Sequence, residues 1–171
     1  SQAKLDEALE CYQKANELDP SNAGVAFRIG EIYRDQGDLD QAMKLFDITL
    51  KIEENHIQAM LEKADIFKKK GSVDKALENL DEAREVHGDR TPIAISEAEI
   101  YKAQGKYDDA IALYEELLQK HPGSGALRVN YALCLQEISR FDESEKHYRR
   151  AIEDMEDPKD AISNYLMGLH Y

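Results

Sequence analysis

The chain contains no tryptophan, only two cysteines and only four prolines among its 171 residues. Two cysteines, Cys11 and Cys134, cannot form the dense disulfide framework of a small secreted domain. They fall in different units of a 34-residue repeat, and stacked repeats several units apart cannot bring their Cα atoms within the disulfide reach of about 7 Å. We therefore expect free thiols, which fit a reducing compartment or serve as apolar filler. No apolar run approaches the roughly 18 residues that span a bilayer, and the first residues lack a secretory signal. These absences predict a cytoplasmic location.

Positive charge is also scarce. The 22 Lys and Arg residues are outnumbered by 35 Asp and Glu residues, which gives a formal net charge of −13. Nucleic acid and anionic membrane surfaces are bound by a surplus of Lys and Arg, so we expect neither as a partner. The acidic surplus is consistent with a protein or peptide partner of basic character, and equally with a surface that is simply well solvated.

Catalytic and metal-binding motifs are absent from the sequence. There is no phosphate-binding loop, no dinucleotide fingerprint and no nucleophile elbow, and Gly123-Ser124-Gly125 has the wrong spacing for any of them. The five histidines show no metal-ligand spacing, and the acidic segment 153–157 lacks the alternating oxygen ligands of a calcium loop. We therefore predict no enzymatic activity, no cofactor and no metal site.

The most prominent feature that is present is a repeat of 34 residues. An aspartate recurs at this spacing at Asp6, Asp40, Asp74, Asp108 and Asp142. A small residue follows two positions later at Ala8, Ala42, Ala76, Ala110 and Ser144. A fixed period of this length is typical of stacked helical repeats, in which each unit contacts its neighbours.

Helix boundaries follow from the turn residues within each repeat. Asn22, Asp38, Ser72 and Thr91 stand where a side chain can cap a helix start. Gly37, Gly71 and Gly105 stand where a helix ends in left-handed geometry, and Ser139 takes that position in the last repeat, which predicts a less favourable turn there. The resulting pattern predicts a series of helices of about 13 to 17 residues joined by short turns.

Small and aromatic residues recur at matching positions of the repeats: Gly30, Tyr33, Gly37, Ala42 and Phe46; Ala64, Phe67, Gly71, Ala76, Leu80 and Ala83; Ala98, Tyr101, Gly105, Ala110, Tyr114, Leu117 and Pro122; Ala132, Leu135, Tyr148 and Ala151. This framework resembles the tetratricopeptide repeat family. The resemblance implies an all-α fold, a right-handed α-solenoid of antiparallel helix pairs. We expect one array over 1–171: a half repeat at 1–20 with the second helix only, full repeats at 23–56, 57–90, 91–124 and 125–158, and a half repeat at 159–171 with the first helix only.

In this family the first helix of each pair lines the concave face, so that face can be found by the 34-residue step. An apolar row contains Phe27, Leu61, Ile95 and Val129. An acidic row contains Glu31, Asp65 and Glu99, and a basic row contains Arg34, Lys68 and Lys102. Acid and base are three residues apart on one helix, so local ion pairs Glu31–Arg34, Asp65–Lys68 and Glu99–Lys102 are expected, each worth about a few tenths of a kcal/mol.

Two interpretations of these rows remain open. In one, the apolar row is a strip for an extended or helical peptide, and the charges at its edges set the register. In the other, the apolar side chains pack against neighbouring first helices and the charges neutralise one another. The carboxylate clamp of the family's chaperone-tail binders is excluded, because Phe27, Glu31, Glu62, Pro92 and Ser96 replace its lysines, arginine and asparagines.

Two further rows are predicted to form the core between repeats. They contain Val25, Ala59, Ile93 and Leu127, and Ile32, Ile66, Ile100 and Cys134. Cys134 therefore serves as a small hydrophobic residue and not as a nucleophile.

The sequence predicts a protein–protein interaction scaffold, and two alternatives stay open. The first is a targeting arm of a larger enzyme, because Ser163-Asn164-Tyr165-Leu166 with His170-Tyr171 is similar to a segment of repeat-bearing glycosyltransferases and sulfotransferases. The second is a self-assembling scaffold, because both ends of the array lack a polar capping helix and invite end-to-end contact. The chain begins within a repeat, so we expect its native N-terminus to lie upstream.

Overall fold

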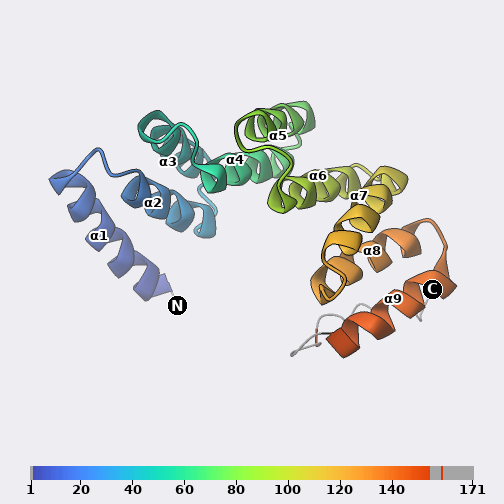
Figure 1. Cartoon of the computed structure of the whole chain (residues 1–171). Coiled ribbons are helices and arrows are strands. Elements are labelled where there is room, and N and C mark those ends of the chain that lie inside the picture. Colours follow the sequence, from blue (N-terminus) through green and yellow to red (C-terminus); the bar gives the residue numbers. More distant parts are fainter. Residues whose placement is uncertain (1, 155–158, 160–171) are drawn as a thin grey trace. The chain divides into compact units, whose positions relative to one another are not determined.

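The computed structural model describes residues 2–154 and residue 159, and these residues form helices and turns with no strand. Figure 1 shows the helices labelled in their order along the chain. Their bounds are α1 (Gln2–Leu18), α2 (Ala23–Asp35), α3 (Leu39–Ile52), α4 (Ile57–Lys69), α5 (Val73–His87), α6 (Thr91–Ala103), α7 (Tyr107–Lys120), α8 (Gly125–Glu137) and α9 (Phe141–Asp154). The fold is an all-α helical-repeat solenoid, as predicted. The expected helix at 159–171 lies outside the described residues, apart from Lys159.

The helices divide between two compact units, Ser1–Arg90 and Thr91–Tyr171. In the first unit each of the helices α1 to α5 packs against its neighbours in sequence, and in the second unit α6 to α9 do the same. We call α2, α4, α6 and α8 the first helices, and α1, α3, α5, α7 and α9 the second helices. The aspartates of the 34-residue series, Asp40, Asp74, Asp108 and Asp142, are each the second residue of a second helix.

The turn from each first helix to the following second helix has the same backbone geometry. Gly37, Gly71 and Gly105 have φ angles of 85°, 73° and 73°, and Ser139 has a φ angle of 63°. In each turn the next amide reaches back to a carbonyl near the helix end, as in Asp38 N to Tyr33 O at 2.9 Å and Arg140 N to Leu135 O at 2.8 Å. This is the glycine-terminated helix end described by the Schellman motif. Ser139 therefore adopts a left-handed conformation that suits glycine better.

Two of the four predicted helix caps form, and two do not. Asn22 Oδ1 accepts a hydrogen bond from Val25 N at 3.1 Å, and Asp38 Oδ1 accepts one from Gln41 N at 3.0 Å. Ser72 occupies the cap position of α5 but makes no side-chain cap bond. Thr91 begins α6, and its hydroxyl lies 2.9 Å from His121 Nε2, so it is not the predicted cap.

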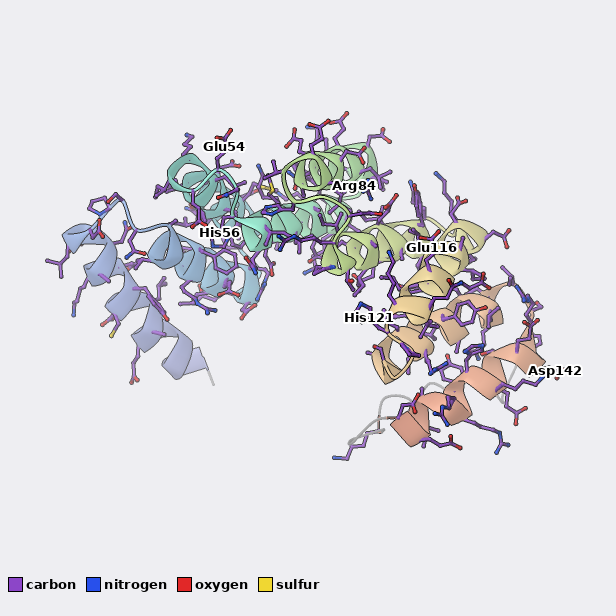
Figure 2. All side chains as sticks on the ribbon, in the orientation of Figure 1. Glu54, His56, Arg84, Glu116, His121 and Asp142 are labelled. Carbon is purple, nitrogen blue, oxygen red and sulfur yellow. The ribbon has the colours of Figure 1, made fainter. Side chains whose placement is uncertain are left out.

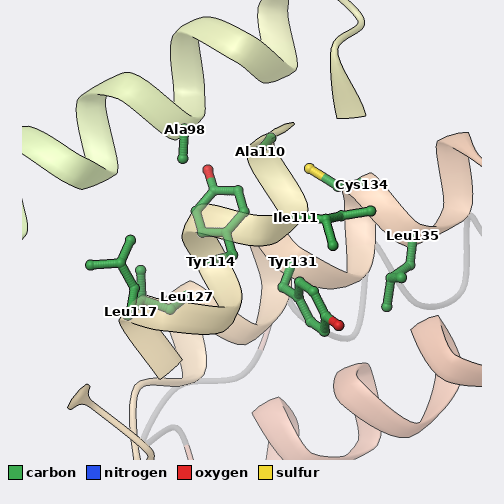
Figure 3. Packing of buried hydrophobic residues seen from close by; sticks show 9 residues of the cluster. All are labelled: Ala98, Ala110, Ile111, Tyr114, Leu117, Leu127, Tyr131, Cys134 and Leu135. Carbon is green, nitrogen blue, oxygen red and sulfur yellow. The ribbon is translucent and has the colours of Figure 1, made fainter. Parts of the chain in front are cut away.

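Small residues allow the paired helices to approach closely, and aromatic rings fill the space between them. A Cβ atom at Gly30 would lie 2.7 Å from Phe46 Cε1 and 3.2 Å from Leu45 Cβ, so α2 and α3 pack too tightly there for any side chain. Ala42, Ala64, Ala76, Ala98, Ala110 and Ala132 are all fully buried. Figure 3 shows the same packing in the second unit, where the hydroxyl end of Tyr114 is directed toward Ala98.

The two rows predicted as core are buried, with one exception. Ala59, Ile93, Leu127, Ile32, Ile66, Ile100 and Cys134 are buried, and Val25 is half-buried. Burial raises the pKa of the Cys134 thiol to about 11. At neutral pH Cys134 is therefore a protonated, apolar filler, as predicted. Both cysteines are free thiols, with Cys11 exposed.

Candidate partner-binding surface

The three predicted rows occupy equivalent positions of the first helices. Phe27, Leu61, Ile95 and Val129 are each the fifth residue of their helix. Glu31, Asp65 and Glu99 are each the ninth residue, and Arg34, Lys68 and Lys102 are each the twelfth. Positions five, nine and twelve are three or four residues apart, so α2, α4 and α6 each carry their three residues on one side, and α8 contributes Val129 alone.

The apolar row differs in accessibility along its length. Phe27 is 8% exposed, because its ring centroid lies 5.5 Å from that of Phe46 and 4.7 Å from that of His56. Val129 is 9% exposed and packs with Tyr148 of α9. Leu61 and Ile95 are half-buried. Packing within the protein buries most of the side-chain surface of Phe27 and Val129. Leu61 and Ile95 are therefore the more accessible members of the row.

The charged rows are paired, but only partly in the predicted way. Asp65 is held at 2.8 Å by Lys68 and at 2.7 Å by Lys69. Glu31 pairs with Arg28 at 2.6 Å and not with Arg34, which corrects the prediction. Arg34 instead contacts Asp35 at 2.8 Å and Glu62 of α4. Lys102 donates to Asn130 Oδ1 of α8 at 2.7 Å.

Arg34–Glu62 and Lys102–Asn130 are related by two repeats. In both, the basic residue reaches a side chain 28 positions later on the next first helix of the same unit. Sequence reasoning missed Glu62 and Asn130, because it searched for partners on the same helix. The spacing of 28 residues could have indicated these partners. It equals one 34-residue repeat minus six, so each partner lies six positions before the residue of the next first helix that is equivalent to the basic residue.

The ion pairs of Asp65 and Arg34 favour the charged forms of these two groups. Burial alone would raise the pKa of Asp65, but hydrogen bonds from Lys68 and Lys69 lower it overall. Burial likewise works against the charge of Arg34, and its hydrogen bonds to Glu62 and Asp35 outweigh that effect and raise its pKa. Both shifts favour the ionised form of the paired groups.

An open hollow of about 440 Å³ lies between α2 and α4. His56, which caps α4 and is labelled in Figure 2, is one of its lining residues. Its lining residues on α2 are Gly24, Phe27, Arg28 and Glu31. Those on α4 and its cap are His56, Gln58, Leu61 and Glu62. Three of the ten predicted surface residues, Phe27, Glu31 and Leu61, thus surround one concavity.

Other expected features can be placed only in part. Among the residues that the structure describes, no group of three or more His, Cys, Asp or Glu side chains is arranged to hold a metal ion. No helix over the same residues is long and apolar enough to cross a membrane. The glycosyltransferase-like segment Ser163–Leu166 with His170-Tyr171, and the end face expected at 159–171, lie outside the described residues except for Lys159.

A family model described as tetratricopeptide repeat matches residues 1–64 and 101–164. These matches cover more than half of the chain, and the chain belongs to the tetratricopeptide repeat family. Among curated proteins, none matches the chain. As a helical-repeat member of this family, the protein is a protein-interaction scaffold.

Solved structures share the fold. TTC0263, a tetratricopeptide repeat protein of Thermus thermophilus, aligns with a TM-score of 0.84 at 18% identity, over 99% of this chain and 93% of that chain. MamA aligns with a TM-score of 0.70 at 20% identity, over 90% of each chain. YrrB, described as a tetratricopeptide repeat protein with an unusual peptide-binding site, aligns with a TM-score of 0.65 at 20% identity, over 99% of this chain and 84% of that chain. At these identities the similarity establishes the fold alone.

Proposed function

We propose that the protein binds a peptide segment of a partner protein along the surface of its first helices. The contact residues are those of the three rows: Phe27, Leu61, Ile95 and Val129; Glu31, Asp65 and Glu99; Arg34, Lys68 and Lys102. The observation that carries this proposal is the hollow between α2 and α4, which three of these residues line. A concave site with an apolar base and a few convergent polar groups is the usual form of a ligand site.

The solvent accessibility of the row residues indicates what each could contribute to peptide binding. Leu61 and Ile95 are half-buried, so each keeps apolar surface that a bound side chain can cover. Phe27 and Val129 act mainly by shaping the base of the surface, since little of either is exposed. The ion pairs at the edges are partly exposed, so they contribute more to the register and selectivity of a peptide than to its affinity.

YrrB supports the proposal by analogy, because its description records a peptide-binding site on the same fold. A peptide ending in a free carboxylate is a poor candidate. Glu31 and Glu62 line the hollow, and their charges would repel a terminal carboxylate. A partner segment of basic character fits better.

Selection of peptides from a random display library on the intact chain tests the proposal. We expect Leu61→Ser to weaken a selected peptide about tenfold, since it removes buried apolar contact. Ile48→Ser is the matched control, because Ile48 is 41% exposed on the second helix α3 and lies outside the rows. Equal losses in the two variants, or no selected peptide at all, would refute the proposal.

A further inference from the structure

The hollow between α2 and α4 has two kinds of lining. Phe27 and Leu61 give it an apolar base, and Gly24 leaves one side open because it has no side chain. Glu31 and Glu62 provide carboxylates, and each has 23% of its side chain exposed. A long side chain with an apolar stem and a charged head matches this division.

The charges around the hollow do not balance. Arg28 pairs with Glu31, and Arg34 is shared between Glu62 and Asp35. Among the residues that line the hollow, Arg28 is a cation and Glu31 and Glu62 are anions, so carboxylates outnumber cations by one; Arg34 and Asp35 lie outside this lining. The ring of His56 is held at the start of α4, where its Nδ1 accepts a hydrogen bond from Ala59 N at 3.2 Å.

The carboxylates also retain acceptor capacity. Glu31 accepts from Arg28 through Oε2, and Glu62 accepts from Arg34 through Oε1. A carboxylate has about four acceptor positions over its two oxygens, so one arginine bond to each leaves room for another donor. The arginine guanidinium supplies several donors in a fixed fork, and the lysine ammonium supplies three.

We infer that this hollow is a pocket for a single cationic side chain, arginine or lysine, of the bound peptide. The inference rests on the proposed function and names the residue type that anchors the peptide. The stem lies on Phe27 and Leu61, and the head is held between Glu31 and Glu62. The lining holds one more carboxylate than cations, which suits a single basic residue and not a polybasic run. The volume of about 440 Å³ is ample for one long side chain.

The test uses small peptides and the full 171-residue chain labelled with ¹⁵N. The probes are the capped tripeptide Ala-Arg-Ala, its lysine analogue, and an analogue with citrulline, which has nearly the shape of arginine but no charge. We expect the arginine and lysine probes to shift the backbone amide signals of Gly24 and Gln58 saturably, with Kd on the order of 1 mM. The citrulline probe should bind about tenfold more weakly.

Variants of the hollow distinguish this pocket from general attraction to an acidic protein. Gly24→Leu should weaken the arginine probe about tenfold by filling the hollow, while Gly24→Ala should stay within about twofold. The matched control is sound because a Cβ at Gly24 meets only Asn22 Oδ1, at 3.4 Å. Glu31→Gln should weaken binding, and Arg28→Gln should tighten it about threefold by removing the competing cation. Glu116→Gln, which changes an exposed carboxylate of the second helix α7 outside the rows, should leave binding unchanged.

Three results would overturn the pocket: no saturable shift at Gly24 and Gln58, equal binding of the citrulline probe, or unchanged binding to Gly24→Leu. Each is separable from failure of the proposed function. If the pocket is wrong but the function is right, selected peptides still bind in a Leu61-dependent way without requiring a basic residue. If the function is wrong, no Leu61-dependent peptide is found, even where the tripeptide binds.

Discussion

At the scale of the residue, Gly30 is where the packing of α2 on α3 is tightest. An added methyl group would meet Phe46 at 2.7 Å, and Phe46 is itself fully buried. We expect Gly30→Ala to lower the free energy of unfolding by about 1–3 kcal/mol, because overpacking outweighs the gain in helix propensity. Urea denaturation measures this. Gly24→Ala on the same helix has space for its methyl group, and its stability should be unchanged or slightly raised; a similar loss in both variants would contradict the packing argument.

Ser139 is a position where a substitution should stabilise the protein. Its φ angle of 63° is left-handed, and the matching turn at Gly105 has a φ angle of 73°. Ser139→Gly should raise the free energy of unfolding by about 1 kcal/mol, because it relieves the Cβ clash of that conformation. Gly105→Ser should lower it by a similar amount. Thermal unfolding of both variants tests the pair, and two changes of the same sign would show that the turns are not equivalent.

The two thiols should differ in reactivity. Cys134 is buried, and its pKa is raised to about 11, whereas Cys11 is exposed. A thiol reacts as its thiolate, so native protein should react with Ellman's reagent at one thiol per chain and denatured protein at two. Cys11→Ser should abolish the fast reaction. Rapid reaction of that variant would place Cys134 outside the core.

At the scale of the element, we expect the stability of α9 on α8 to depend on pH through His147. Its ring lies edge-on to Tyr131 at 4.5 Å, and its pKa is lowered from 6.5, first by burial and then by Arg128. Glu143 of α9 and Glu115 of α7 oppose the shift without cancelling it. Because the folded state disfavours the proton, the stability that neutral His147 provides is complete above the unfolded value of 6.5. It is lost as pH falls through the lower folded value.

His147→Gln should therefore flatten the acid limb of the stability curve. Urea denaturation of wild type and variant between about pH 7.5 and about pH 5 is the measurement. Carboxylate titration affects both proteins alike, so the difference between them isolates the histidine. We expect wild type to lose more stability than the variant over this interval. Parallel curves would mean that His147 is equally easy to protonate in the folded and unfolded chain.

The elements also show which features were predictable from sequence. The 34-residue period placed the helix pairs, because turn glycines and buried alanines are required by backbone geometry and close packing. Local ion pairs were less predictable. Arg34 is three residues from Glu31 yet contacts Glu62, because a neighbouring helix brings a carboxylate within reach that the helix wheel does not show. Phe27 was assigned to the surface row, but Phe46 and His56 cover most of its ring.

At the scale of the whole molecule, the proposed binding surface follows from repetition. One helix position, repeated four times, gives a row of side chains, and the differences within that row create local sites such as the hollow beside Gly24. The 34-residue period was sufficient to predict the fold. The hollow could not be predicted in the same way. It depends on which side chains pack inward and which ion pairs form between helices, and the 34-residue period does not determine either.

Photo-crosslinking to a selected peptide tests the central proposal most directly. Benzoylphenylalanine is placed at Leu61 on a first helix or, as the control, at Ile48 on a second helix. The account predicts efficient crosslinking from position 61, little from position 48, and loss of the position 61 product when unlabelled peptide is added in excess. Crosslinking that is stronger from position 48, or equal from both, would contradict a binding surface on the first helices.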